Sequence, residues 1–313
     1  MKKLSILFVA LIVTVLAACG NTSTTGSNNK EEKATEVTIK HELGEAKVKV
    51  NPKKVVVFDF GILDTLDKLE VKVTGVPQKN IPEYLSKYKD ASYKNVGGLK
   101  EPDFEAISEL APDVIFISGR QSAAYDELSK IAPTVYVAVD SANYVESFKK
   151  NMNIIGEIFD KKQEIADELT KFDASVAEIN EKAKAIEGKS LVILVNDGSV
   201  SAYGSKSRFG IVHDVFGLAP ADEKIEASTH GQSISFEYIA EKNPEYLFVV
   251  DRGAVVAGES SAQKVLDNKL VNGTNAAKNG HIIYLDPNYW YLSGGGLVSV
   301  EEMVKEIEAG IAK

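Results

Sequence analysis

Two arginines stand where an α/β protein binds its ligand. Arg120 follows the apolar run VIFISG, and Arg252 follows the run LFVVD. In open α/β sheets, ligands lie beyond the carboxyl ends of the strands, and both runs read as strands that end just before an arginine. A guanidinium group stays charged and can bond an oxygen anion through two N–H groups at once. The two positions therefore predict a binding site for an anion.

Both arginines end a repeated segment. Shifted by 132 residues, Phe104–Arg120 lies over Phe236–Arg252 without a gap, and seven of the seventeen positions are identical. The second residue of each copy is a glutamate, Glu105 or Glu237. A carboxylate in the first turn of a helix is favoured by the helix dipole, which explains each glutamate alone. Because the repeat places one on each half of the chain, we also consider the pair as docking points for a partner with two subunits.

The elements that would carry these residues alternate between strands and helices. Short runs rich in β-branched and aromatic residues predict buried strands, with helix-like segments between them. The pattern indicates an α/β fold made of two similar lobes. The predicted strands begin at Val55, Val71, Asp113, Thr134, Ser190, Tyr246 and His281.

A long helix is predicted between the two halves. Residues 161–187 contain neither Gly nor Pro, and their apolar positions recur at alternating steps of four and three, which places one stripe on one helix face. Asp160 and Gln163 resemble a capping box at its start, and Gly188 follows its end. We therefore expect an N-terminal lobe over 37–160, a linking helix over 161–187 and a C-terminal lobe over 188–313.

The N-terminus indicates export and attachment to a membrane. Two lysines, a short apolar run and the sequence LAAC have the layout of a signal peptide over residues 1–18, and the run is too short to cross a membrane. The segment resembles a bacterial lipoprotein signal, in which the cysteine, here Cys19, is acylated. Residues 19–36 are polar and rich in Gly, Ser, Thr and Asn, so we expect a flexible tether. These features predict a lipid-anchored protein on the extracytoplasmic face of the cell membrane.

Charge and residue types argue against several other functions. The net charge of −9 disfavours binding to nucleic acid. A direct zinc or manganese site needs about four clustered ligands, and the four histidines are dispersed in the sequence. No GxSxG or HExxH motif indicates a hydrolase. We expect a binding protein without catalytic activity and without a covalently bound cofactor.

Several motifs resemble one family of binding proteins. The lipoprotein signal, the tether, the linking helix and the repeated units PDFEAISELAPDVI and SFEYIAEKNPEYLFV resemble the class III substrate-binding lipoproteins of bacterial ABC importers. The motifs SGRQS, SAYGSKSRFGIVHDVFG, STHGQSISFEYI, FVVDRG and WYLSGGG look like the subgroup that binds petrobactin-type catecholate siderophores. The resemblance implies the class III fold, with a ligand cleft between the two lobes.

The resemblance also implies roles for individual residues. The three cleft arginines of the subgroup match Arg120, Arg208 and Arg252, which would neutralise an anionic ferric catecholate complex. His230 and Tyr291 match residues that fill iron positions left open by a siderophore with fewer than six donor atoms. Further candidates are Lys100 for the cleft, and Glu105 with Glu237 for docking to the permease.

The expected function follows from these matches. The protein would act as a monomer that captures an iron(III)-siderophore complex and delivers it to an ABC permease dimer with its ATPase. A cobalamin or haem carrier of the same fold, and a direct metal-ion carrier, are the alternatives. The arginine trio separates the first of these, because a largely neutral corrinoid does not need it.

Overall fold

The computed structural model describes residues 35–259 and 262–312. The predicted signal peptide, the lipidation site Cys19 and nearly all of the predicted tether lie outside these residues. The described chain begins with a hairpin of two antiparallel strands, β1 (Glu36–His41) and β2 (Gly44–Lys49). The folded part therefore starts one residue before the predicted boundary at Val37.

The first lobe is built on a parallel sheet of five strands in the order β5-β4-β3-β6-β7. Its strands are short, and every residue of the three inner strands, β4, β3 and β6, is buried. The elements of this lobe, in chain order, are β3 (Val55–Val57), α1 (Phe60–Lys68), β4 (Gly75–Val76), the 3₁₀ helix η1 (Glu83–Lys89), β5 (Lys94–Asn95), α2 (Phe104–Leu110), β6 (Val114–Ile117), the 3₁₀ helix η2 (Gly119–Ala124), α3 (Tyr125–Ile131), β7 (Thr134–Tyr136), the 3₁₀ helix η3 (Ser141–Asn143) and α4 (Tyr144–Ile158).

The second lobe also contains a five-stranded sheet, in the order β10-β9-β8-β11-β12. Strands β8, β11 and β12 are parallel, whereas β9 and β10 run antiparallel to their neighbours. Its elements are β8 (Ser190–Asn196), β9 (Ser199–Tyr203), α6 (Ile211–Asp214), β10 (Gln232–Ile234), α7 (Phe236–Lys242), β11 (Tyr246–Asp251), α8 (Arg252–Val256), α9 (Ala262–Leu266), α10 (Lys269–Asn272), α11 (Asn275–Asn279), β12 (Ile282–Leu285), the π-helix η4 (Asn288–Ser293) and α12 (Leu297–Ile311).

The sequence repeat is also a structural repeat. In the first lobe α2 leads into β6, and in the second lobe α7 leads into β11, each the fourth strand of its sheet. Asp103 and Ser235 cap the two helices, each accepting a hydrogen bond from the backbone N–H three residues on. Both helices end at a left-handed residue, Ala111 or Asn243. The predicted α/β fold with two similar lobes is confirmed.

The structure corrects two local predictions. The strand predicted from Val71 is reduced to Gly75–Val76, because Val71 instead follows the C-terminal turn of α1 and donates its N–H to the carbonyl of Leu66. The linking helix α5 spans Lys162–Lys184, which is shorter at both ends than predicted. The N-cap residue of the helix is Lys161, one position after the predicted Asp160, and the side chain of Lys161 makes no capping bond. The stripe is otherwise as expected, with Leu169 and Ile179 among its buried positions.

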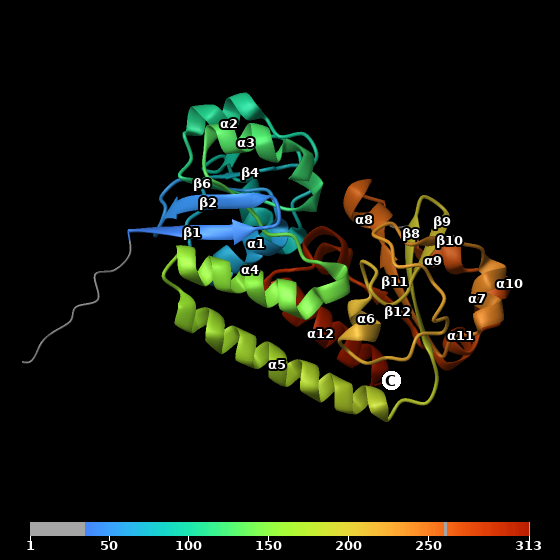
Figure 1. Ribbon diagram of the computed structural model, residues 1–313. Helices are drawn as coiled ribbons and strands as arrows, with labels where there is room; N and C mark the ends of the chain where they lie inside the picture. Colours follow the sequence, from blue (N-terminus) through green and yellow to red (C-terminus); the bar gives the residue numbers. More distant parts are fainter. Residues whose placement is uncertain (1–34, 260–261, 313) are drawn as a thin grey trace, which may run out of the picture. The chain divides into compact units, whose positions relative to one another are not determined.

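Two helices connect the lobes in different ways. Figure 1 shows α5 running below α4 toward the second lobe, and α12 lying between α5 and α1. The last helix therefore returns from the second lobe to the first. The predicted division at 188–313 did not include this return, and the lobe boundaries stay a prediction.

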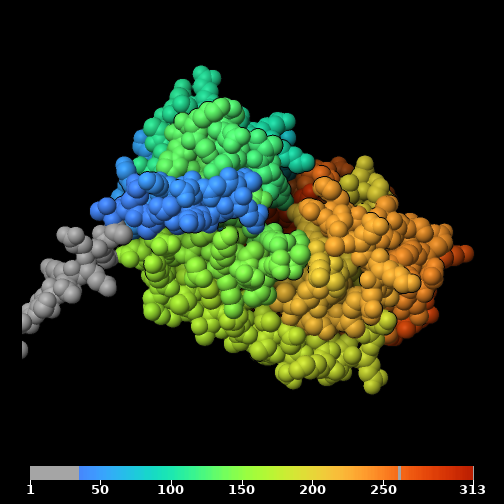
Figure 2. Space-filling model, in the orientation of Figure 1, coloured from blue at the N-terminus to red at the C-terminus, as the bar shows by residue number. Residues whose placement is uncertain are grey.

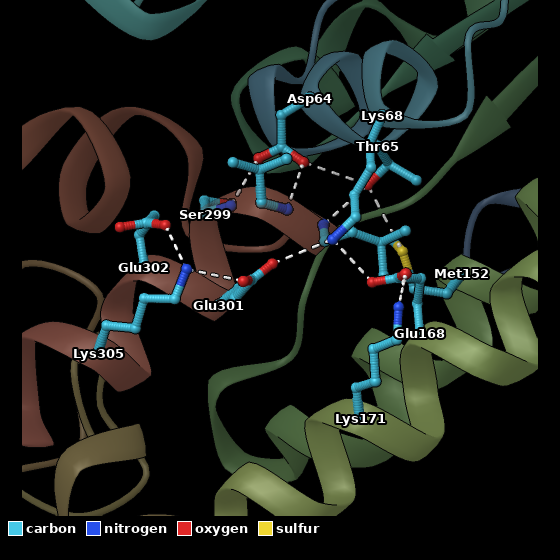
Figure 3. A network of polar contacts seen from close by, with 12 residues as sticks. Asp64, Thr65, Lys68, Met152, Glu168, Lys171, Ser299, Glu301, Glu302 and Lys305 are labelled. Carbon is cyan, nitrogen blue, oxygen red and sulfur yellow. Dashed lines mark hydrogen bonds and ion pairs between the residues drawn. The ribbon is translucent and has the colours of Figure 1, made fainter.

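A chain of polar contacts fixes α12 to the first lobe. The fully buried carboxylate of Asp64 on α1 accepts hydrogen bonds from the backbone N–H groups of Val298 and Ser299 in the first turn of α12. Lys68 on the same helix bridges Glu168 of α5 and Glu301 of α12 (Figure 3). A carboxylate at a helix N-terminus satisfies N–H groups that have no partner within the helix.

In the described part of the chain, none of the helices has the length and apolar character needed to cross a membrane.

Candidate functional site

Arg120 is positioned by a capped turn at the end of β6. It lies in η2, where Ser118 and Gln121 form a capping box. The side chain of Gln121 also donates to the carbonyl of Leu99, which fixes the neighbouring loop against η2. Arg120 thus lies beyond the carboxyl end of a central parallel strand, as the sequence predicted.

The other two arginines lie in the second lobe. Arg252 is the first residue of α8, directly after β11, and the helix is capped by the buried side chain of Asp251. Arg208 lies in the turn between β9 and α6, and its guanidinium carbon stands 5.5 Å from the ring centre of Phe209. The backbone N–H of Arg208 donates to the carbonyl of Ser228. All three arginines are half-buried.

The three arginines converge on one residue, Tyr291. Arg120 and Arg208 each donate a hydrogen bond to its backbone carbonyl, at 2.9 and 2.6 Å. Arg252 donates through Nε to its hydroxyl at 2.8 Å and through another nitrogen to the side-chain oxygen of Asn196. The guanidinium carbon of Arg208 also lies 4.2 Å from the centre of the Tyr291 ring. We call these four residues, Arg120, Arg208, Arg252 and Tyr291, the arginine cluster.

The arginine cluster uses every arginine of the protein. The chain contains three arginines, and all the other basic side chains that make up its 36 Lys and Arg residues are lysines. Because arginine occurs at this one place and lysine is used everywhere else, we infer that the site needs the planar fork of the guanidinium group. Arg208 lies outside the repeat, so this count is the signal that identifies it without any family resemblance.

A π-helical turn presents Tyr291 to the arginines. The residues NYWYLS form η4, in which the N–H of Gly294 donates to the carbonyl of Tyr289. In this turn Tyr291 points to the arginines, whereas the ring of Tyr289 packs against Tyr84. Trp290 is buried and donates its ring N–H to Glu306, so it belongs to the core. Single π-helical turns occur often at functional sites.

The arginines favour the ionised form of the tyrosine. Burial opposes ionisation of the Tyr291 hydroxyl, but the hydrogen bond from Arg252 and the charges of the three arginines outweigh it, so the pKa of Tyr291 is lowered. Burial, together with the charge of Arg120, lowers the pKa of Arg208. The cluster therefore gathers positive charge that is partly shielded from water, and an anion entering it would be stabilised.

The remaining predicted site residues lie on exposed loops and helix starts. His230 is exposed, and its backbone N–H donates to the hydroxyl of Ser228 in the turn that contacts Arg208. Lys100 is exposed and follows Leu99, the residue held by Gln121 beside Arg120. Both residues therefore lie within two positions of a residue that is bonded to an arginine of the cluster or to that arginine's neighbour. Within 35–259 and 262–312, neither side chain makes a hydrogen bond or ion pair with the cluster.

The two glutamates of the repeat are also exposed. Glu105 lies in the first turn of α2, and Glu237 lies in the first turn of α7. Neither belongs to the arginine cluster. Their equivalent places on the two lobes agree with the repeat that singled them out.

Sequence reasoning missed two residues beside the cluster. Asn196, at the carboxyl end of β8, bonds Arg252. Asp59 caps α1, and burial raises its pKa although its hydrogen bonds and the nearby charge of Arg120 oppose this. Each follows a run of apolar strand residues, so a polar residue at a strand end was the available signal.

The described residues contain no group of three or more His, Cys, Asp or Glu side chains placed to hold a metal ion. The rings of His41, His213 and His281 are each bonded to a backbone carbonyl instead. The residue set that the structure does assemble is cationic, and it fits an anion.

A family model described as periplasmic binding protein matches residues 55–289, which include most of both lobes and all three arginines of the cluster. The chain belongs to this family. Members of the family are substrate-binding proteins, and the fold is the class III fold with a mixed α/β lobe on either side of the linking helix.

Several relatives of this periplasmic binding protein are named as siderophore-binding proteins. Over its full length and that of the relative, the chain is 54% identical to the petrobactin-binding protein YclQ of Bacillus subtilis. The solved structure of YclQ superimposes with a TM-score of 0.87 at 55% identity, covering 89% of this chain and 99% of that one.

Two further relatives agree with this grouping. The chain is 35% identical to the ferric-anguibactin-binding protein FatB of Vibrio anguillarum, with 88% of each protein covered. The structure of the periplasmic catecholate-siderophore-binding protein VctP from Vibrio cholerae superimposes with a TM-score of 0.82 at 38% identity, covering 88% of this chain and 99% of that one.

Proposed function

We propose that this protein captures a ferric catecholate siderophore of the petrobactin type and delivers it to an ABC permease for iron uptake. The observation that carries the proposal is the convergence of all three arginines on Tyr291 from both lobes. A ferric catecholate complex is anionic and presents aromatic rings. Guanidinium groups can bond its oxygens and stack on its rings. The names of YclQ and VctP support the same class of ligand.

The ligand would replace hydrogen bonds that the residues of the arginine cluster make with one another. Arg120 and Arg208 are held by the backbone carbonyl of Tyr291, a neutral acceptor. Catecholate oxygens are negatively charged, so they add a Coulomb attraction that the carbonyl lacks, and a guanidinium group can bond an oxygen anion through two N–H groups at once. The arginines are thus preorganised by weak partners that a charged ligand can displace.

Iron coordination by the protein would depend on the ligand. The lowered pKa of Tyr291 brings its phenolate form closer to neutral pH, and a phenolate is a hard oxygen donor that suits ferric iron. His230, in the exposed turn against Arg208, would supply a nitrogen donor. We propose that these two residues fill coordination positions only when the siderophore leaves them open.

Delivery completes the proposed role. Acylation of Cys19 would anchor the protein to the extracytoplasmic face of the membrane as a monomer. Glu105 and Glu237 would then each dock one subunit of the permease dimer, whose ATPase drives import. The protein itself would carry out binding and no catalysis.

The double substitution Arg120→Ala with Arg252→Ala tests the site. These arginines come from different lobes and reach different atoms of Tyr291. Titration of the wild-type protein with a ferric bis-catecholate should quench its fluorescence saturably, and the double variant should lose this response. Unchanged affinity in the double variant would overturn the anion site.

A further inference from the structure

A polar hollow lies beside the arginine cluster, and the function proposed above does not use it. Its volume is about 520 Å³, within the range of small-molecule sites. One wall comes from the first lobe and the other from the second. Figure 2 shows the surface hollowed between these two parts, where the blue and green residues face the gold ones. We call it the rim hollow. Its principal polar residues are Glu42, Tyr136 and Asp140 from the first lobe, and Lys206, Ser228 and Thr229 from the second.

The rim hollow adjoins the arginine cluster on both lobes. Tyr136 of the hollow has its hydroxyl oxygen 3.9 Å from the point where a side chain on Gly119 would begin, and Gly119 precedes Arg120. On the second lobe, Ser228 of the hollow accepts the backbone N–H of Arg208. The hollow and the arginine cluster are therefore neighbours on both lobes.

The charge of the rim hollow differs from that of the cluster. The cluster holds three guanidinium groups, whereas the hollow holds two carboxylates and one lysine. The carboxylate of Asp140 accepts hydrogen bonds from the side chain of Asn143 and from the backbone N–H of Ala142, which lowers its pKa and keeps it ionised. Glu42 makes no hydrogen bond or ion pair with the residues in 35–259 and 262–312, so its carboxylate is available to a ligand.

We propose that the rim hollow is a second subsite, which binds a protonated amine on the backbone of the siderophore through Glu42 and Asp140. The inference rests on the proposed function, since the arginine cluster must hold the anionic ferric catecholate end. A ligand that is anionic at its iron and cationic on its backbone then finds a complementary charge at both places. The hydroxyls of Tyr136, Ser228 and Thr229 can bond the amides or hydroxyls next to the amine.

A matched pair of ligands tests this subsite. Two synthetic ferric bis-catecholates would have linkers of equal length, one interrupted by a secondary amine and the other by an ether oxygen. Fluorescence titration would give both dissociation constants for the wild-type protein and for the double variant Glu42→Gln with Asp140→Asn. Asparagine can still cap the turn at 140, so the local fold is retained. Glu45→Gln, an exposed change on the same hairpin, is the control.

The wild-type protein should bind the amine ligand about 3- to 10-fold more tightly than the ether ligand, because partly exposed ion pairs contribute modestly. The double variant should abolish this preference and leave the ether ligand unaffected, and Glu45→Gln should change neither. Removing the opposing charge with Lys206→Gln should increase the preference. High salt should reduce it, since the hollow is open to solvent.

Other outcomes separate the two proposals. If the wild-type protein binds both ligands equally, or if the preference survives the double variant, the amine subsite is wrong and the arginine site stands. If the double variant weakens both ligands by the same factor, the two carboxylates support the cleft in general and do not select an amine. If neither ligand binds the wild-type protein, the proposed function itself fails.

Discussion

The substitution Arg208→Gln should weaken ligand binding strongly while it changes stability little. The guanidinium carbons of Arg208 and Arg252 lie 4.2 and 5.6 Å from the centre of the Tyr291 ring. They are therefore at most about 10 Å apart, so the two like charges repel by at least about 1.7 kcal/mol at an effective dielectric constant of about 20. Arg120, which shares the Tyr291 carbonyl with Arg208, adds to this repulsion. Solvent and salt reduce this repulsion further, because both side chains are only half-buried.

The loss of favourable contacts offsets the relief of repulsion. Arg208→Gln removes the hydrogen bond to the Tyr291 carbonyl and the stacking on two rings, each worth about 1 kcal/mol. The free energy of unfolding of the empty protein should thus change by less than about 2 kcal/mol. The bound complex loses a contact between a guanidinium group and an anion, worth about 1.5–3 kcal/mol, which is a 10- to 100-fold loss of affinity.

Urea unfolding and fluorescence titration of the same samples measure the two effects. Arg208→Lys is the matched control, since it keeps the charge but not the planar fork, and its affinity should lie between those of the wild type and Arg208→Gln. A destabilisation above about 3 kcal/mol would mean that Arg208 mainly supports the fold. Unchanged affinity would refute its role in the site.

The remaining predictions address docking, iron coordination and pH. Glu105→Ala with Glu237→Ala should stop uptake of ferric siderophore by cells and leave binding intact; loss of binding would mean that the glutamates belong to the ligand site. His230→Ala should weaken a tetradentate ferric complex at least several-fold and spare a hexadentate one, whereas equal loss for both would give it a loop role. Burial raises the pKa of Asp64 from 3.8 to about 7, so its stabilising contribution is present below pH 4 and is lost as the pH rises through 7. The wild-type free energy of unfolding, measured relative to Asp64→Asn, should therefore fall between pH 4 and 7 by up to about 1.4 kcal/mol per unit, and a constant difference would contradict the raised pKa.

The repeat was the part of the sequence that predicted most. Helix, left-handed cap, buried strand and terminal arginine follow each other in both lobes, because each step has a local cause in capping, chain reversal and burial. The apolar stripe of α5 could also be predicted, because its periodicity has a local cause in the burial of one helix face. The prediction that the arginine at the end of each strand belongs to the ligand site followed from the geometry of open α/β sheets, in which ligands bind beyond the carboxyl ends of the strands.

Contacts between segments that are distant in the chain could not be predicted from the sequence. Nothing in the sequence around Asp64 indicates that it meets the N-terminus of α12, more than 230 residues later. The rim hollow likewise combines the β1–β2 turn with loops of the second lobe. The turn residues of β1–β2 and the short strands β4 and β5 carry too weak a pattern to be assigned, since two-residue strands owe their place to their neighbours.

A titration against a panel of ligands tests the central claim most directly. Trp290 is the single tryptophan, and its ring lies 6.4 Å from that of Phe209, which neighbours Arg208. Its fluorescence can therefore report a ferric complex bound at the arginine cluster. We predict tight, saturable quenching by a ferric bis-catecholate, and much weaker responses to a ferric hydroxamate, haem and cobalamin. Preference for haem or cobalamin over the catecholate would contradict the account.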